Sequence, residues 1–212
     1  MKTRIKMCGI VTPEDAVAVA GAGADYLGLV LTESPRRVTL EEARAIRAAV
    51  PNADLVGVFR DEAPEQVAPL VDALRLRAVQ VEGWLDRVPW EPADVWHVLR
   101  GASLPEPSTL PMIPLRTYLL DGYDPALPGG TGKQADLDWA RIAVRDGLRI
   151  FIAGGLNPGN VGALVRDVRP YGVDVSTGLQ LAGAPPGRKD LAKVRAFIEQ
   201  VRQADRDRPK RS

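Results

Sequence analysis

The residue best suited to chemistry is Cys8, the single cysteine of the chain, which ends a short apolar run and precedes Gly9. Lys6 lies two residues earlier, and residues two apart on a strand share one face about 6–7 Å apart. An ammonium group at that distance favours the thiolate, the reactive form of cysteine. A free cysteine is also commonly a small, inert, buried side chain. Both interpretations are open on these residues alone.

Two aspartates stand where a catalytic site could use them. Asp121 closes an apolar run ahead of a glycine-rich segment, and with Cys8 it would form an acid and base pair of different chemical types. An aspartate before a turn is equally typical of a cap or turn residue. Asp174 lies two residues before Ser176 on the same face of a predicted strand. It is suited to binding substrate hydroxyls or an amine nitrogen, or to a buried structural role.

Arginine in a short loop offers a grip for a carboxylate. Arg36 follows Pro35, which stiffens the loop, and Arg37 is the next residue. A planar guanidinium group binds a carboxylate through two parallel hydrogen bonds. Either arginine could serve on this argument.

A phosphate site is predicted near the C-terminal end of the chain. The formal net charge is +1, so the protein has no global field to hold nucleic acid or an anionic membrane, and an anion must be met locally. Backbone N–H groups after late strands commonly cradle phosphate. The candidates are the glycine and hydroxyl residues of two loops: Gly154, Gly155, Ser176, Thr177 and Gly178.

Alternating strands and helices must position these residues. We predict eight strands, near residues 4–8, 25–31, 54–59, 77–82, 93–100, 115–121, 149–153 and 172–176. Helix starts are predicted at Thr12-Pro13, Thr39, Ala63-Pro64, Asn157-Pro158 and Asp190. Residues 102–114 contain four prolines, so a loop is expected in place of the fifth helix.

The placement of polar residues distinguishes a closed barrel from an open, doubly wound sheet, which periodicity alone also permits. Polar groups collect at the C-terminal ends of several separate strands, where the active sites of (β/α)₈ barrels lie. The predicted fold is therefore a single-domain α/β protein of the TIM-barrel class, spanning residues 1–203. Residues 204–212 are expected to form a polar, frayed tail.

The remaining composition narrows the class of protein. One cysteine and one histidine are a poor set of ligands for a zinc site, so no metal is expected. The N-terminus is charged where a signal peptide would be apolar, and no apolar stretch approaches the ~20 residues that span a bilayer. A cytoplasmic location is predicted, with no membrane or nucleic-acid partner. Monomer and homodimer are both compatible with the sequence.

An ordered series of motifs resembles the phosphoribosylanthranilate isomerases of tryptophan biosynthesis. The series covers residues 5–190. Its members are Ile5-Lys6-Met7-Cys8-Gly9, Pro13-Glu14-Asp15-Ala16, Ser34-Pro35-Arg36-Arg37-Val38, Gly57-Val58-Phe59, Leu119-Leu120-Asp121, Gly129-Gly130-Thr131-Gly132-Lys133, Asp138-Trp139, Ala153-Gly154-Gly155-Leu156-Asn157-Pro158, Asn160-Val161, Val173-Asp174-Val175-Ser176-Thr177-Gly178, Pro186-Gly187 and Lys189-Asp190.

The resemblance implies a function. Members of this family rearrange N-(5-phosphoribosyl)anthranilate to 1-(2-carboxyphenylamino)-1-deoxyribulose 5-phosphate, an aldose-to-ketose isomerisation that needs no cofactor. It implies that Cys8 is the general base and Asp121 the general acid, and that Arg36, not Arg37, binds the anthranilate carboxylate. The expected partner is a small phosphoribosyl substrate.

The chain departs from the family pattern after the fourth strand. Gln80-Val81-Glu82-Gly83 stands where the family usually has Gln-Leu-His-Gly, so Glu82 replaces an imidazole near the expected substrate. Val11, Thr177 and Gln180 are smaller departures, and the spacing from Lys133 to Trp139 is longer than usual. His97 is not expected to substitute, because it lies within the fifth predicted strand.

These departures leave rival functions open. One is another phosphosugar barrel, such as the histidine-pathway isomerase, which uses aspartate where this chain has Cys8. Another is indole-glycerol-phosphate synthase, whose additional lysine and glutamate catalysts have no evident counterpart here. A rival of another class is a phosphate-binding sensor or scaffold with weak or no catalysis.

Overall fold

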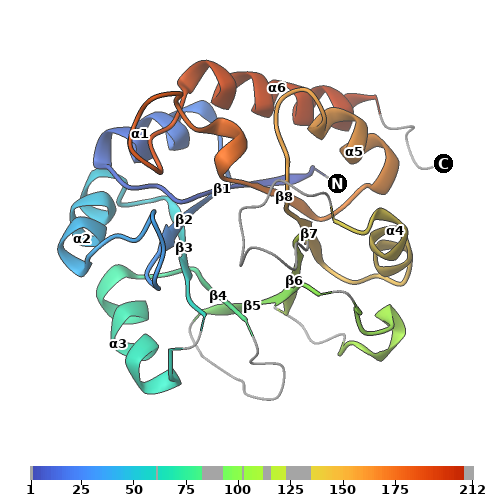
Figure 1. Cartoon of the computed structure of the whole chain (residues 1–212), viewed down its shortest axis with the longest axis horizontal. Coiled ribbons are helices and arrows are strands. Elements are labelled where there is room, and N and C mark those ends of the chain that lie inside the picture. Colours follow the sequence, from blue (N-terminus) through green and yellow to red (C-terminus); the bar gives the residue numbers. More distant parts are fainter. Residues whose placement is uncertain are drawn as a thin grey trace.

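Eight parallel strands form a closed barrel in the computed structural model, each paired with its neighbours in chain order from β1 to β8 and back to β1 (Figure 1). The structure describes residues 2–60, 62–82, 93–101, 103–111, 116–122 and 135–207. The strands are β1 Arg4–Cys8, β2 Tyr26–Val30, β3 Asp54–Val58, β4 Ala78–Val81, β5 Asp94–Leu99, β6 Thr117–Leu120, β7 Ile150–Ile152 and β8 Gly172–Val175. The predicted barrel and its eight strands are confirmed.

Helices surround the barrel on the outside (Figure 1). Within the described residues they are α1 Pro13–Ala22, α2 Leu40–Ala49, α3 Pro64–Leu74, α4 Leu137–Arg145, α5 Val161–Val168 and α6 Leu191–Arg206, with short 3₁₀ turns η1 Pro107–Thr109 and η2 Thr177–Leu179. Between β5 and β6 the described part of the chain contains only η1, as the prolines predict. In the described residues, no helix combines the length and the apolar character needed to cross a membrane.

Side-chain caps begin three of the described helices where the sequence predicts. The Thr12 hydroxyl accepts a hydrogen bond from the Asp15 N–H group, and Thr39 forms a reciprocal capping box with Glu42. Asp190 accepts hydrogen bonds from the N–H groups of residues 192 and 193 at the start of α6. These caps satisfy N–H groups that have no partner inside the helix.

The predicted start of α5 at Asn157-Pro158 is wrong. The helix begins at Val161, and residues 157–160 form a turn before it. The Asn160 side chain accepts a hydrogen bond from the Asn157 N–H group, and the Asn157 side chain accepts one from the Gly159 N–H group. Asparagine competes with helix formation through such local bonds, which explains why the signal lies one turn too early.

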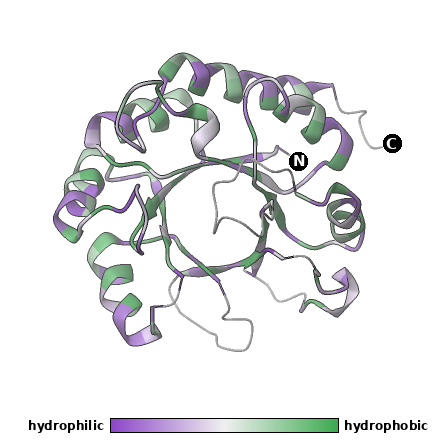
Figure 2. Ribbon diagram, viewed as in Figure 1, coloured by the Kyte–Doolittle hydropathy of each residue, from purple (hydrophilic) through white to green (hydrophobic). Residues whose placement is uncertain are grey.

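Apolar packing fills both faces of the strands. Outward-facing Ile5 and Met7 of β1 belong to one buried cluster with Val19 of α1 and Phe197 of α6. Figure 2 shows the corresponding pattern, in which the strand ring is largely apolar and the surrounding helices carry both polar and apolar residues. Burial of one such large side chain stabilises the fold by about 1.5–3 kcal/mol.

An aromatic cluster occupies the barrel interior toward the N-terminal ends of the strands. The rings of Trp96 and Phe151 stack with centroids 4.4 Å apart, and Tyr26 meets Trp96 edge-on at 5.0 Å. All three side chains are buried, together with Val56 and Leu119. This packing fills the N-terminal half of the barrel, so a ligand cavity can form only toward the C-terminal ends of the strands.

The C-terminal helix extends further than predicted. The frayed tail was predicted to begin at residue 204, but α6 continues to Arg206 and Ala204 is fully buried. The Asp205 carboxylate accepts hydrogen bonds from the Thr3 N–H group at 2.9 Å and from its hydroxyl group at 2.7 Å. The apolar stripe of α6 reaches Ala204, which makes residues 204–206 part of the helix. Residues 208–212 of the predicted tail lie outside the described residues.

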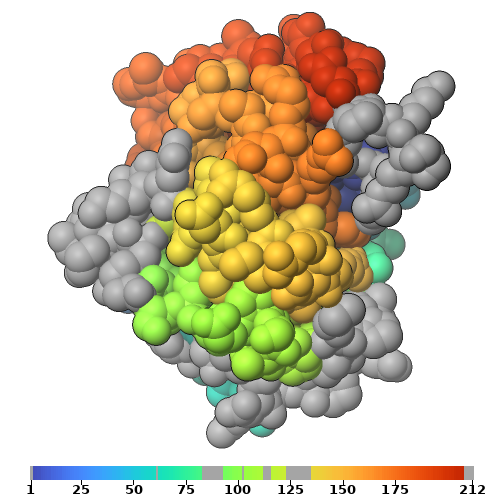
Figure 3. Space-filling view, turned by 90° about the vertical axis from the view of Figure 1, so that its right-hand side faces the viewer, coloured from blue at the N-terminus to red at the C-terminus, as the bar shows by residue number. Residues whose placement is uncertain are grey.

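Neighbouring helices pack against one another on the flank shown in Figure 3. There α4, in yellow, and α5, in orange, lie side by side, with the green segment that contains η1 below them. Contacts between α4 and η1 show that the 3₁₀ turn takes part of the place of a helix. The Trp139 indole donates a hydrogen bond to the Pro105 carbonyl oxygen at 2.7 Å, which fixes the proline-rich loop to α4.

Candidate active site

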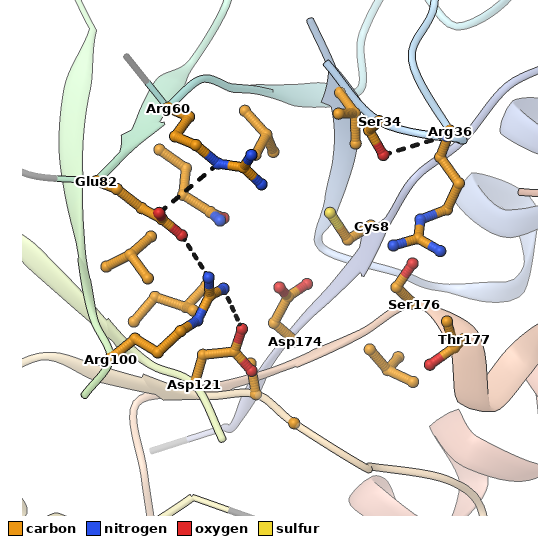
Figure 4. A pocket seen from close by; sticks show the side chains of 18 of the residues that line it. Cys8, Ser34, Arg36, Arg60, Glu82, Arg100, Asp121, Asp174, Ser176 and Thr177 are labelled. Atoms are coloured by element: carbon orange, nitrogen blue, oxygen red, sulfur yellow. Dashed lines mark hydrogen bonds and ion pairs between the residues drawn. The ribbon is translucent and has the colours of Figure 1, made fainter. Parts of the chain in front are cut away.

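One cavity of about 700 Å³ opens among the C-terminal ends of the strands (Figure 4). Its volume is in the range of small-molecule sites. Lys6 and Arg37 do not line it, whereas ten other candidate residues do: Cys8, Arg36, Glu82, Asp121, Gly154, Gly155, Asp174, Ser176, Thr177 and Gly178. The fold thus brings together side chains from six strands or the loops that follow them.

Lys6 lies beneath the cavity and is fully buried. Its Nζ donates a hydrogen bond to Asp174 Oδ2 at 3.0 Å, across the pairing of β1 with β8. Burial works to lower the pKa of Lys6, but Asp174 and Cys8 outweigh it, so this pKa is raised. Burial raises the pKa of Asp174 against the opposing effect of Lys6. The pair fixes Asp174 in the cavity floor and places a firmly charged ammonium group near Cys8.

Cys8 ends β1 with its side chain half-buried in the cavity wall. Lys189 holds the backbone at this point: its Nζ donates to the Cys8 carbonyl oxygen at 2.7 Å and to the Ser176 carbonyl oxygen at 3.4 Å. Burial lowers the pKa of Lys189 to about 8. The lysine therefore joins the end of β1 to the loop after β8.

Lys189 is a site residue that sequence reasoning did not select. It was noted only within the Pro186-Gly187 and Lys189-Asp190 motifs, without a role. Its contact with Cys8 spans 181 positions of the chain, so no local pattern reports it. The only local signal is a lysine next to a helix cap, which is typical of a solvated residue.

Arg36 lies on the same side of the cavity as Ser176 (Figure 4). Its side chain packs over Gly9, whose φ is +71° and where an added Cβ would lie 2.8 Å from Arg36 Cδ. In the described residues the Arg36 guanidinium group has no hydrogen-bond or ion-pair partner, so it is available to a ligand. Arg37 is exposed and does not line the cavity. The geometry therefore supports Arg36 over Arg37.

The two loops of the predicted phosphate cradle both line the cavity. Gly154 and Gly155 have φ values of 87° and 63°, a left-handed conformation that glycine adopts without strain. Within the described part of the chain, neither N–H group donates a hydrogen bond to the protein. The Ser176 hydroxyl group is buried and also lacks a partner there. Polar groups left open in this way are suited to bind an anion.

The opposite side of the cavity carries a chain of alternating charges (Figure 4). Arg100, at the end of β5, contacts Glu82 Oε1 through Nη1 at 2.7 Å and Asp121 Oδ2 through Nη2 at 2.5 Å. Arg60, after β3, lies 3.8 Å from Glu82 through its Nε. The Asp121 carboxylate therefore lines the cavity while it is paired with Arg100.

Sequence reasoning missed both Arg60 and Arg100. A signal was present for Arg100, which shares its strand face with Trp96 and Val98 and stands at the C-terminal end of that strand. An arginine at a strand end is more often solvated. Its position on the inner strand face therefore did not distinguish Arg100 from an ordinary surface arginine. Glu82 was singled out only as a departure from a family pattern, and its contact with Arg100 is new information.

Some expectations concern residues beyond those described. Gly83 and the motif Gly129-Gly130-Thr131-Gly132-Lys133 lie outside the described residues. Among the residues that the structure describes, no group of three or more His, Cys, Asp or Glu side chains is placed to hold a metal ion.

Comparison with known proteins places the chain among close relatives. Residues 5–200 match the family described as PRAI, N-(5'phosphoribosyl)anthranilate (PRA) isomerase. The N-(5'-phosphoribosyl)anthranilate isomerase of Trichlorobacter lovleyi is 43% identical over 95% of this chain and 98% of the relative. The crystal structure of phosphoribosyl anthranilate isomerase from Thermus thermophilus is 34% identical, with a TM-score of 0.79, over 95% of this chain and 99% of that one.

A further structure is of a relative with a ligand. It is a phosphoribosyl anthranilate isomerase in complex with reduced 1-(o-carboxyphenylamino)-1-deoxyribulose 5-phosphate. It is 29% identical to this chain, with a TM-score of 0.75, over 95% of this chain and 99% of that one.

Proposed function

The chain belongs to the N-(5'-phosphoribosyl)anthranilate isomerase family, and on this premise we propose that its cavity performs the family's rearrangement with Cys8 as general base and Asp121 as general acid. The observation that carries the proposal is the shared cavity, which Cys8 and Asp121 line together with Arg36, Gly154 and Gly155. Among the described residues, the Arg36 guanidinium group and the N–H groups of the two glycines have no partner. An acid, a base, a carboxylate grip and an anion cradle are the parts that this substrate requires.

The substrate's two anionic groups suggest how it is oriented. We place the phosphate against Gly154, Gly155 and the Ser176–Gly178 loop, where N–H donors need no surplus positive charge. Arg36 binds the anthranilate carboxylate through its fork of N–H groups. Asp174, held by Lys6 in the cavity floor, faces the sugar hydroxyls or the aniline nitrogen. Glu82 lies on the other wall and reaches the ligand through the arginine chain.

The reaction then consists of proton transfers. Asp121 gives a proton to the furanose ring oxygen while the C1–O bond breaks, and the aniline nitrogen lone pair forms the C1=N bond of a protonated Schiff base. The Cys8 thiolate removes the C2 proton, and the electron pair of that C–H bond forms an enolamine. Tautomerisation adds a proton at C1 and leaves the ketone at C2. Substrate and product have the same oxidation level, so the scheme uses only acid and base groups.

Separate ion pairs on the two sides of the cavity support this division of roles. Lys6 and Asp174 form an ion pair on the side of the cavity that carries Cys8, while Asp121 stands across the cavity with its own partner, Arg100. Base and acid therefore have separate electrostatic surroundings, which allows each to hold a different protonation state.

A turnover assay tests the proposal. Purified protein should consume the fluorescent N-(5-phosphoribosyl)anthranilate substrate, with indole-glycerol-phosphate synthase added to remove the product. Cys8→Ser and Asp121→Asn should keep product affinity within a few-fold and lose turnover. A protein that binds the product analogue or inorganic phosphate but never turns over would instead support the sensor or scaffold alternative.

We further propose that the protein works in the cytoplasm on this small phosphoribosyl substrate, without a nucleic-acid or membrane partner. A net charge of +1 supports the expectation about nucleic acid, and a role in amino-acid biosynthesis supports the compartment. The choice between monomer and homodimer stays a prediction, which sedimentation of the purified protein would decide.

A further inference from the structure

Four charged side chains are linked on the β3 to β6 side of the cavity: Arg60, Glu82, Arg100 and Asp121. Arg100 stands between two carboxylates, with Glu82 on one amino group of its fork and Asp121 on the other. The Arg100 and Asp121 side chains are only 20% and 16% exposed, and Glu82 is 33% exposed. Water therefore screens the contact between Arg100 and Asp121 less than it screens an ordinary surface pair.

The arrangement creates a conflict for Asp121. A general acid must carry a proton when the reaction begins, whereas contact with a guanidinium group stabilises the ionised carboxylate. An arginine devoted to Asp121 alone would oppose the proposed role. Glu82 changes this balance, because the same guanidinium group also neutralises a second carboxylate.

Other charged groups around Asp121 act in known directions. Asp174 faces it from β8 and disfavours a second negative charge, although Lys6 offsets part of that effect. Cys8 lines the same cavity from β1, and Arg60 reaches the group only through Glu82. Among the described residues, Arg100 is the one cation in direct contact with Asp121.

We propose that Arg100 and Glu82 are positioning residues for Asp121: Arg100 fixes the carboxyl group on the cavity wall, and Glu82, by sharing the guanidinium group, lets Asp121 carry the proton that the reaction needs. This inference rests on the proposed function, because it takes Asp121 as the acid. It also gives a role to Glu82, the position where the chain departs most clearly from the family pattern.

The titration of Asp121 itself tests the inference without any substrate. Full-length protein labelled with ¹³C at aspartate carboxyl groups is titrated by NMR, and the Asp121 resonance is identified by its absence from Asp121→Asn. Glu82→Gln should lower the titration midpoint by about half a pH unit, because Arg100 is left to Asp121 alone. Arg100→Met should raise it by about 1–2 pH units. The two shifts must have opposite signs.

A double variant separates direct from indirect action. If Glu82 acts through Arg100, Glu82→Gln should have almost no effect on the midpoint in an Arg100→Met background. Glu33→Gln is the matched control, because Glu33 lines the same cavity and makes no contact with Arg100 in the described residues. It should leave the midpoint unchanged. An unchanged midpoint in Glu82→Gln, or a shift in the same direction as in Arg100→Met, would overturn the inference.

Folding and function are controlled separately. If Arg100→Met does not fold, Arg100→Gln replaces it: the neutral amide removes the positive charge but can still donate a hydrogen bond, so the midpoint should shift with the same sign and a smaller size. In the turnover assay, Glu82→Gln should lower kcat about 3–10-fold with KM within 2-fold. An inactive wild-type protein would contradict the proposed function alone. An active enzyme with an unmoved Asp121 titration would contradict this inference alone.

Discussion

The two walls of the cavity hold their charged residues in different ways. On the β8 and β1 wall, Lys6 and Asp174 form an ion pair whose side chains are 0% and 9% exposed. On the β4 to β6 wall, Glu82, Arg100 and Asp121 form a chain with one end open to solvent. A buried pair is fixed, because separating its charges is costly. In the partly solvated series of Glu82, Arg100 and Asp121, water lowers the cost of moving a proton or a charge.

This difference matches the tasks of the two walls. The β8 and β1 wall, here called the base wall, holds Cys8, the proposed base, beside the proposed phosphate cradle, and Lys189 adds a second buried cation there. If Asp121 is the general acid that we propose, the β4 to β6 wall, here called the acid wall, releases and regains a proton in each cycle. We therefore expect substitutions on the first wall to affect both folding and activity, and those on the second to affect mainly activity and its pH dependence.

The prediction with the largest expected effect concerns the proposed base and acid, one on each wall of the cavity. Cys8→Ser and Asp121→Asn should each lower kcat by roughly 10²–10⁴-fold, because each removes a group that transfers a proton in the transition state. Steady-state kinetics checks this, with circular dichroism to confirm folding. Near-normal turnover in either variant would remove that residue from the mechanism.

The second prediction concerns stability on the base wall. Lys6→Met leaves Asp174 buried without a partner and should lower the free energy of unfolding by about 3–5 kcal/mol. Lys6→Met combined with Asp174→Asn should recover much of this loss. Urea unfolding measures both. The control is Arg141→Met, which breaks a pair between Arg141 and Asp167 on the surface of α4 and α5 and should leave the unfolding free energy almost unchanged. Equal losses of unfolding free energy in Lys6→Met and Arg141→Met would contradict the expected difference between the buried pair and the surface pair.

The third prediction concerns substrate binding beside the base wall. Arg36→Ala should weaken binding by about 2–4 kcal/mol, seen mainly as a higher KM, because a bidentate contact with the carboxylate is lost. Arg37→Ala is the matched control and should behave like the unsubstituted protein, since Arg37 lies outside the cavity lining. The reverse result would move the carboxylate grip to Arg37.

The fourth prediction concerns the outer side of β5, behind the acid wall. Burial, with a smaller effect from Arg116, lowers the pKa of His97 to about 4. The unfolded chain binds this proton near pH 6.5 and the folded protein does not, so stability should fall as the pH drops from about 6.5 to about 4, by about 3 kcal/mol at most.

His97→Leu isolates that contribution. The unfolding free energy of the unsubstituted protein should drop between pH 7.5 and pH 4.5 by about 2–3 kcal/mol more than that of His97→Leu. Parallel pH curves for the two proteins would show that His97 is not buried in its neutral form.

Much of the architecture was predictable because it follows from local patterns. Alternation along each strand placed Cys8, Asp121 and Asp174 on the inner face, and cap residues such as Thr39 marked helix starts. These signals depend on neighbours within a few positions. The early start assigned to α5 failed for the same reason, since asparagine serves a turn as readily as a cap.

The missing parts of the site depend on contacts between distant segments. Lys189 reaches Cys8 across 181 positions, and Arg100 is defined by carboxylates on two other strands. Lysine and arginine near loop ends are common on protein surfaces, so their types carried no information. Only the closed barrel makes them partners of the proposed base and acid.

The contact between the two ends of the chain has a consequence for how the protein is made. Asp205 binds Thr3 across 202 positions, and Arg202 Nη1 donates to the Thr3 carbonyl oxygen at 2.6 Å. During synthesis, β1 therefore leaves the ribosome long before β8 and α6 exist to cover its edge. An uncovered strand edge is a template for pairing with other chains.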